Sequence, residues 1–157
     1  YGDWCTLGSK DHRVITSLEL ESTIMEQRNL HLQTKYESMQ KEVRFEEYMT
    51  EDADYLFVAY GSASRICMKS IEIAREKGIK VGLLRPITLY PFPNKVLSEL
   101  SNKVKGILTV ELNAGQMVED VKLAVDCKIP VEFFGRNGGI IPSPNEIVEE
   151  YYSKNAA

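Results

Sequence analysis

Four apolar runs after residue 54, each followed by a stretch of helical period, limit the folds open to this 157-residue chain more than any other feature. The runs are YLFVAYG (55–61), VGLLRP (81–86), GILTVELN (106–113) and VEFFGR (131–136). They are apolar at successive positions, a pattern typical of parallel strands covered by helices on both faces. Connections between such strands are nearly always right-handed. We therefore predict an α/β fold with three layers, α/β/α, around an open sheet.

Start and stop signals flank the helices predicted between these strands. The first helix is expected to end at Lys77-Gly78, a glycine signal for a helix C-terminus. The expected starts are Ser62 as an N-cap, Pro93 or Asn94, a position after Asn113, and Ser143-Pro144.

A long polar helix and a short alternating segment precede the repeats. Residues 21–41 contain strong helix formers and neither Gly nor Pro, with a predicted capping box at Thr23 and Glu26. The segment VRFEEY (43–48) alternates and predicts a strand at a sheet edge. We expect residues 1–41 to form an N-terminal arm and interdomain helix, and residues 42–157 to form the α/β domain.

Composition excludes several classes of function. The 19 Lys and Arg against 23 Asp and Glu give a net charge of −4 without a basic stripe, which argues against nucleic acid binding. No apolar run approaches the ~18 residues of a membrane span, so we expect a cytoplasmic protein with no membrane partner. The first residue is Tyr1, so we expect a piece of a longer polypeptide. Cys5, Cys67 and Cys127 form no CxxC pair, and no metal site is predicted.

Ligands and partners approach an open parallel sheet at the carboxyl ends of its strands. At the end of the first apolar run, Gly61, Ser62 and Ser64 could hold an anion at a helix N-terminus or could form only a turn and a cap. The most polar cluster, Glu111, Asn113, Gly115 and Gln116, lies at the end of the third run and just beyond it. Glu111 could serve as a general acid or base, or it could brace the loop amides.

Two arginines also stand at strand ends. Arg136 with Asn137 could clamp a carboxylate or phosphate of a substrate or partner, and Arg85 presents the same chemistry at the end of the second run. Gly138-Gly139 beside Arg136 could equally be a plain turn. No residue set of the chain predicts a catalytic nucleophile or acid–base pair, so no catalytic residue is assigned.

Long motifs carry a resemblance to a known family. VGLLRPITLYPFP, VELNAGQMVEDVKLAV, FFGRNGGIIPSPNEI and, upstream, VITSLELESTIMEQRNLHLQTKYESMQ resemble the C-terminal domain of the alpha subunit of 2-oxoacid:ferredoxin oxidoreductases, most closely the 2-oxoisovalerate (branched-chain) type. The resemblance implies a domain like the transketolase C-terminal domain, with a mixed sheet of about five strands, four parallel and one antiparallel at the edge. VRFEEY would be that edge strand, with the first and third strands side by side.

The resemblance also implies a function for the parent enzyme. Such enzymes convert a 2-oxoacid to an acyl-coenzyme A and CO2 and reduce ferredoxin, using thiamine diphosphate, magnesium and iron–sulfur clusters. The thiamine lies between the N-terminal part of the alpha subunit and a separate beta subunit. The thiamine motif begins with Gly-Asp-Gly, whereas the single Gly-Asp here, Gly2-Asp3, precedes Trp4.

We therefore expect a scaffold and subunit-contact domain that binds no cofactor and is inactive alone. Its partners would be the N-terminal part of the alpha subunit and the other subunits, with ferredoxin reached through the complex. Two alternatives stay open. One is a free-standing module that binds a small anion at Gly61, Ser62, Ser64 and Arg136, and the other is an enzyme that uses Glu111.

Overall fold

The computed structural model describes residues 18–155, with side chains described as far as Tyr151. Cys5 and the first part of the predicted arm lie outside this range. The chain divides into two compact units, Tyr1–Ser38 and Met39–Ala157.

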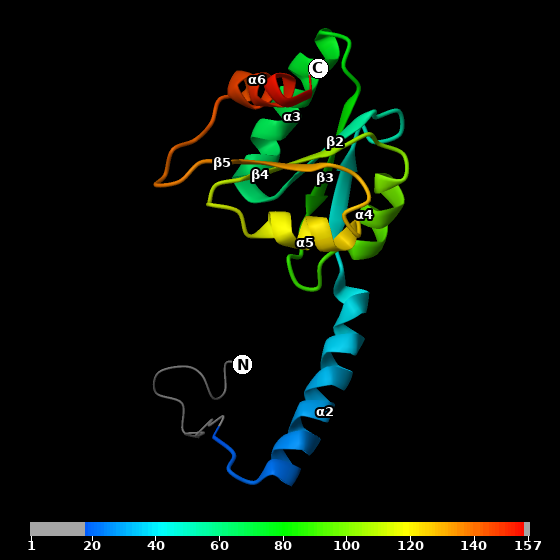
Figure 1. The fold of residues 1–157 in the computed structure, drawn as a ribbon, viewed down its shortest axis with the longest axis vertical. Coiled ribbons are helices and arrows are strands. Elements are labelled where there is room, and N and C mark those ends of the chain that lie inside the picture. The colour runs from blue at the N-terminus through cyan, green and yellow to red at the C-terminus, as the bar shows by residue number, and fades with distance from the viewer. Residues whose placement is uncertain (1–17, 156–157) are drawn as a thin grey trace, which may run out of the picture. The chain divides into compact units, whose positions relative to one another are not determined.

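A five-stranded mixed sheet forms the centre of the second unit (Figure 1). Its strands are β1 (Phe45–Tyr48), β2 (Tyr55–Ala59), β3 (Val81–Pro86), β4 (Ile107–Glu111) and β5 (Val131–Gly135). Their order is β1-β3-β2-β4-β5. β1 runs antiparallel to β3, with Phe45 opposite Pro86, and the other three pairings are parallel. The predicted edge strand, its direction and its position beside the third strand are confirmed.

Helices cover both faces of the sheet. Helix α3 (Gly61–Glu76) packs against α6 (Pro144–Asn155), and α4 (Asn94–Ser101) packs against α5 (Met117–Ala124). In Figure 1 these pairs lie on opposite sides of the sheet. Strand β2 shows why its run is continuously apolar: Phe57 and Ala59 belong to the core beneath α3 and α6, while Leu56 and Val58 belong to the core beneath α4 and α5. The three-layer prediction is confirmed.

Most helix termini of the second unit agree with the sequence signals, and the start of α3 differs. Lys77 caps the end of α3 and Gly78 follows with φ +83°, a left-handed conformation that suits glycine. Helices α4 and α6 begin at Asn94 and Pro144 as predicted. The prediction that Ser62 caps α3 is wrong, because α3 already begins at Gly61.

The first unit contributes helix α2 (Ser22–Ser38), and a 3₁₀ turn, η1 (Met39–Glu42), leads into β1 in the second unit. The predicted capping box is wrong. Thr23 lies inside the helix, and its hydroxyl donates to the Glu21 carboxylate at 3.3 Å. No residue of α2 is buried.

Deleting residues 1–38 is expected to leave a remainder that folds cooperatively, with a melting temperature within about 3 °C of the full chain. The physical reason is that every described core residue lies between Ala53 and Tyr151. Circular dichroism and calorimetry on the two chains would measure this. A remainder without a thermal transition would show that the arm belongs to the core.

Candidate functional site

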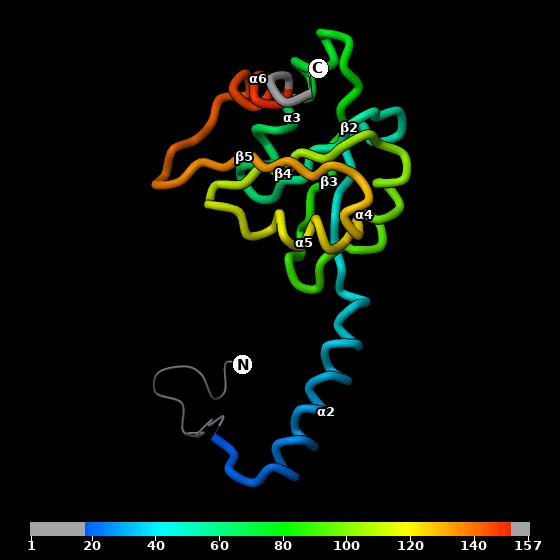
Figure 2. Tube along the Cα trace, in the orientation of Figure 1, coloured from blue at the N-terminus to red at the C-terminus, as the bar shows by residue number. Residues whose placement is uncertain are grey.

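The polar residues predicted at the strand ends gather mainly around the end of β4. Figure 2 shows the loops after β4 and β5 leaving the sheet on the same side. Glu111 pairs with Gly135 in the sheet register, and the Arg136 amide donates to the Glu111 carbonyl at 3.2 Å. The two loops therefore start from neighbouring backbone positions.

Glu111 is the last residue of β4 and is 1% exposed. Its carboxylate accepts hydrogen bonds from the amides of Met117 at 2.9 Å, Val118 at 3.0 Å and Gln116 at 3.3 Å. These amides begin α5, where the first turn has no partners within the helix and the dipole favours negative charge. A strand carboxylate thus takes the place of a local N-cap. Of the two arrangements that the sequence left open, these contacts are those of the bracing one.

Asn113 extends this network toward β2. Its Nδ2 donates to the Glu111 carboxylate at 3.0 Å and lies 3.4 Å from the Tyr60 hydroxyl, while its Oδ1 accepts from the Gly115 amide at 2.7 Å. Gly115 has φ +99°, a conformation that a side chain would strain. The cluster predicted from the sequence is therefore one connected structure that includes Tyr60, which the sequence did not single out.

Gly135 is a second residue that sequence reasoning missed. A Cβ at this position would lie 2.5 Å from the Asn113 carbonyl oxygen and would overlap the Phe133 ring. Only glycine lets the loop after β4 approach β5 so closely. The available signal was a glycine directly at a strand end, which often marks a close backbone approach.

Asp120 lies on the exposed side of α5, and its pKa is affected by the charge of this network. Burial raises the pKa of its carboxyl above the ordinary value, and the negative charges of Glu111 and Glu119 act in the same direction. A carboxyl with a raised pKa costs the folded state stability once it ionises. The cost is absent below pH 3.8, the ordinary pKa, and is complete above the folded-state pKa.

Asp120→Asn is therefore expected to raise the melting temperature at pH 7 by about 1 to 2 °C, since the partly exposed charge is screened by solvent. The gain should shrink to nothing as the pH falls below 3.8. Melting curves of the two proteins from pH 3 to 8 would check this. A gain independent of pH would assign the effect to helix propensity instead.

Arg136 connects β5 to α6. Its guanidinium pairs with Glu146 and lies 5.6 Å from the centroid of the Phe134 ring. Glu146 also forms a true capping box, accepting from the Ser143 amide at 2.7 Å while its own amide donates to the Ser143 hydroxyl at 3.2 Å. These bonds hold the pKa of Glu146 below its usual value, the Ser143 amide most strongly and then Arg136. Asn137, next in the chain, is exposed.

The other predicted positions lie apart from this cluster. Arg85 pairs with Glu46 across β1 and β3, with 2.7 Å between Nη1 and Oε2. Ser64 is buried and donates to the Gly61 carbonyl at 2.7 Å. Gly61, with φ +56°, and Ser62 are exposed beside a hollow of about 100 Å³. The Ser64 hydroxyl is therefore used in a hydrogen bond within the chain. The predicted anion position at Gly61 and Ser62 is only a shallow hollow.

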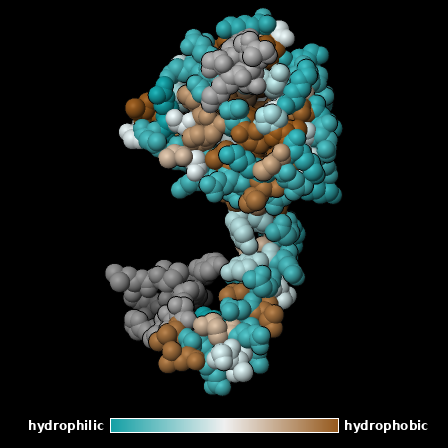
Figure 3. Space-filling view, in the orientation of Figure 1, coloured by the Kyte–Doolittle hydropathy of each residue, from teal (hydrophilic) through white to brown (hydrophobic). Residues whose placement is uncertain are grey.

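The strand-end loops also expose large apolar side chains, none of which was predicted as a site residue. Figure 3 shows hydrophobic residues at the tip of the loop after β5. The sequence signal for these exposed side chains was the presence of branched apolar residues inside loops. The exposed fractions are 49% for Ile87, 44% for Leu89, 39% for Leu112, 59% for Ile140 and 69% for Ile141.

Within residues 18–155, no group of three or more His, Cys, Asp or Glu side chains could hold a metal ion. Cys67 is buried, and burial raises the pKa of its thiol, whereas Cys127 is exposed. The described residues therefore do not fit an iron–sulfur cluster. None of the described helices has the length and apolar character needed to cross a membrane.

The fold is thus a mixed α/β domain with a hydrogen-bonded polar network around Glu111 at its strand ends. Residues 53–147, more than half of the chain, match the family "Pyruvate:ferredoxin oxidoreductase core domain II", and the chain belongs to that family. It is 42% identical over 150 residues to the ketoisovalerate oxidoreductase subunit VorB of Methanothermobacter marburgensis, covering 94% of this chain and 42% of that protein. The chain thus spans less than half the length of this curated relative.

Solved structures support the fold. The 2-oxoglutarate:ferredoxin oxidoreductase from Magnetococcus marinus, solved with 2-oxoglutarate, coenzyme A and succinyl-CoA bound, matches with a TM-score of 0.73 and 19% identity, covering 87% of this chain and 24% of that one. A split-gene transketolase, in an inactive beta4 tetramer, matches with a TM-score of 0.60 and 18% identity, covering 70% of this chain and 40% of that one. The predicted family and the likeness to transketolase are confirmed.

Proposed function

We propose that this chain is the scaffold and subunit-contact part of a 2-oxoacid:ferredoxin oxidoreductase. One observation carries the proposal: the strand-end polar groups of Glu111, Asn113 and Arg136 are engaged within the chain, whereas the exposed side chains of the same loops are largely apolar. Exposed apolar side chains at the carboxyl ends of the strands are better suited to contact another protein than to bind a small charged ligand.

The parent enzyme is proposed to convert a branched-chain 2-oxoacid to acyl-coenzyme A and CO2 and to reduce ferredoxin. Support for the branched-chain substrate is the 42% identity to the ketoisovalerate oxidoreductase subunit. Thiamine diphosphate with magnesium, iron–sulfur clusters and coenzyme A would belong to other parts of the complex. The N-terminal part of the alpha subunit and the remaining subunits are the proposed direct partners, and ferredoxin is the proposed electron acceptor. The cytoplasmic location and the lack of a nucleic acid partner stay predictions.

The contact role predicts that loop residues matter for assembly and little for folding. Ile140→Asp with Ile141→Asp should weaken association with the other subunits by about a hundredfold, because two exposed apolar anchors would become charged. The melting temperature of the chain should hold within about 2 °C, since both side chains are exposed. Native mass spectrometry of the reconstituted complex over a dilution series would measure association.

Leu123→Asp is the matched control, since Leu123 is 74% exposed on α5 and lies outside the strand-end loops. It should leave association unchanged. Full assembly of the double loop variant would refute the contact role. Calorimetric binding of phosphate by the isolated chain, lost in Ser62→Ala, would favour the anion-binding module instead.

A further inference from the structure

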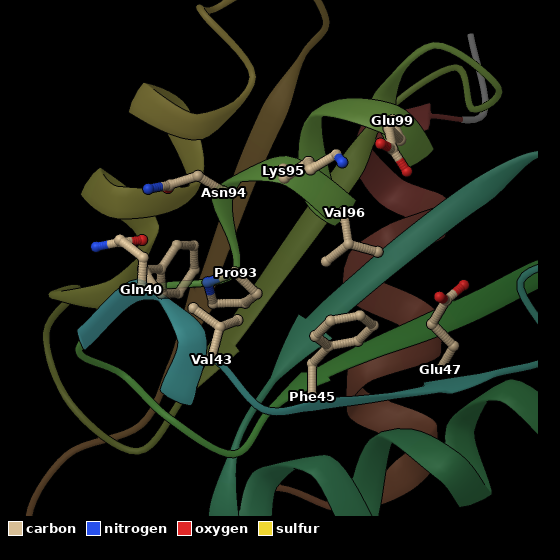
Figure 4. A pocket seen from close by; sticks show the side chains of 10 residues that line it. Gln40, Val43, Phe45, Glu47, Pro93, Asn94, Lys95, Val96 and Glu99 are labelled. Carbon is tan, nitrogen blue, oxygen red and sulfur yellow. The ribbon is translucent and has the colours of Figure 1, made fainter. Parts of the chain in front are cut away.

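A groove of about 620 Å³ lies between the edge strand β1 and the start of α4 (Figure 4). β1 and the residues just before it contribute Val43, Phe45 and Glu47, which alternate along the chain and therefore face the same side. The opposite wall comes from Phe92 to Val96 and from Glu99. None of these residues was predicted as part of a site.

The base of the groove is apolar, and its rim is polar. Phe45 is 38% exposed although it is a large aromatic residue in a strand, and Val43 and Val96 are half-buried. Figure 4 shows the Phe45 ring opposite Val96, with Pro93 and Val43 beside them. Such an open slot leaves room for one or two apolar side chains that the described chain does not supply.

Charge is distributed unevenly along the rim. Figure 4 places the Glu47 and Glu99 carboxylates at the end of the groove next to Phe45 and Val96, while the amides of Gln40 and Asn94 stand at the other end. Glu47 accepts a hydrogen bond from the Thr50 hydroxyl at 2.7 Å, which neutralises none of its charge. Lys95 also lines the groove, but among residues 18–155 no ion pair joins it to either carboxylate. The carboxylate end is therefore complementary to a cation.

β1 also has a free edge. It is the terminal strand of the sheet, and no strand in the described part of the chain pairs with its outer side. Unpaired backbone groups along such an edge can accept an extended segment of another chain, with alternate side chains entering neighbouring pockets. The groove next to β1 is such a pocket.

We propose that this groove docks an extended segment of a partner subunit that carries an apolar anchor side chain next to a lysine or arginine. The anchor packs between Phe45 and Val96, and the basic side chain reaches Glu47 and Glu99. The inference rests on the proposed membership in a multisubunit oxidoreductase and names one contact surface within it.

Photo-crosslinking in the assembled oxidoreductase tests the occupant directly. With p-benzoylphenylalanine in place of Phe45, irradiation should join this chain to a partner-subunit peptide, and mass spectrometry should find Lys or Arg within two residues of an apolar residue in it. A crosslink to a second copy of this chain, to its own subunit or to a peptide without a basic residue would overturn the proposal. The absence of any crosslink in an assembled complex would also overturn the proposal.

Charge reversal provides a second readout that does not depend on the crosslinker. Glu99→Lys, on the exposed side of α4, should weaken subunit association about tenfold at low salt and less at high salt, without lowering the melting temperature. Glu76→Lys, exposed at the end of α3 on the other face, is the matched control and should leave association unchanged. Equal association of the two variants would contradict the groove. If the unaltered chain fails to assemble with the other subunits, the proposed function itself fails.

Discussion

Replacing Glu111 with alanine is expected to lower the free energy of unfolding by about 3 to 5 kcal/mol, a large fraction of what a domain of this size possesses. The carboxylate is 1% exposed and accepts from three amides at the start of α5 and from Asn113. Alanine would leave those donors without an acceptor in a buried place and would open a cavity between β4 and α5.

Urea denaturation followed by circular dichroism would measure the loss, with the slope of the transition checked for change. Glu111→Gln separates charge from shape, because its oxygen can still accept while its NH2 group faces donors; we expect an intermediate loss. Glu119→Ala, at an exposed position on the same helix, is the matched control and should change stability by under about 1 kcal/mol. A stable Glu111→Ala domain in a parent complex that has lost turnover would instead support the acid–base role.

The order of elements was predictable because it depends on local patterns of burial. β2, β3 and β4 are buried on both faces, so each apolar run marks a strand, and the glycine at position 78 marks where α3 ends. The antiparallel edge strand was less evident from its residues, since Phe45 and its neighbours are mostly exposed. Its direction came from the resemblance to a known family.

Helix caps were predicted less well, because a cap depends on where the backbone turns. Ser62 failed as a cap because Tyr60 is already extended and Gly61 turns the chain into α3 one residue earlier. Rules based on spacing search within three or four residues of a helix start, whereas Glu111 reaches α5 from a strand, up to seven residues away. The capping box at Ser143 and Glu146 did follow the rule and was available in the sequence.

The partners of the candidate site residues were beyond sequence reasoning for a different reason. Phe45 and Val96 line the same groove, and Arg85 donates a hydrogen bond to Glu46. In both cases the two residues lie about 40 to 50 positions apart in the sequence. Which segments meet is decided by the strand order, and which side chains face each other is decided by the register. Neither can be read from one segment alone.

The isolated chain is expected to show no oxidoreductase activity, and this is the largest functional effect that we predict. Decarboxylation of a 2-oxoacid needs an electron sink, which thiamine diphosphate supplies when it is bound in enzymes of this kind. Electron transfer through a cluster needs about four cysteine ligands, and the whole sequence has three cysteines. Of these, Cys67 is buried in the core and Cys127 is exposed on the turn after α5, so the two are not placed to share a cluster.

The measurement supplies the purified chain with 2-oxoisovalerate, thiamine diphosphate, magnesium, coenzyme A and an electron-accepting dye. Dye reduction should stay at background with this chain alone and should appear when the remainder of the alpha subunit and the partner subunits are added. A Glu111→Ala chain in the same reconstitution should restore less turnover, because a destabilised scaffold lowers the amount of assembled enzyme. Reduction by the chain alone that persists through further purification would overturn the scaffold assignment, because the catalytic groups would then have to lie within these 157 residues.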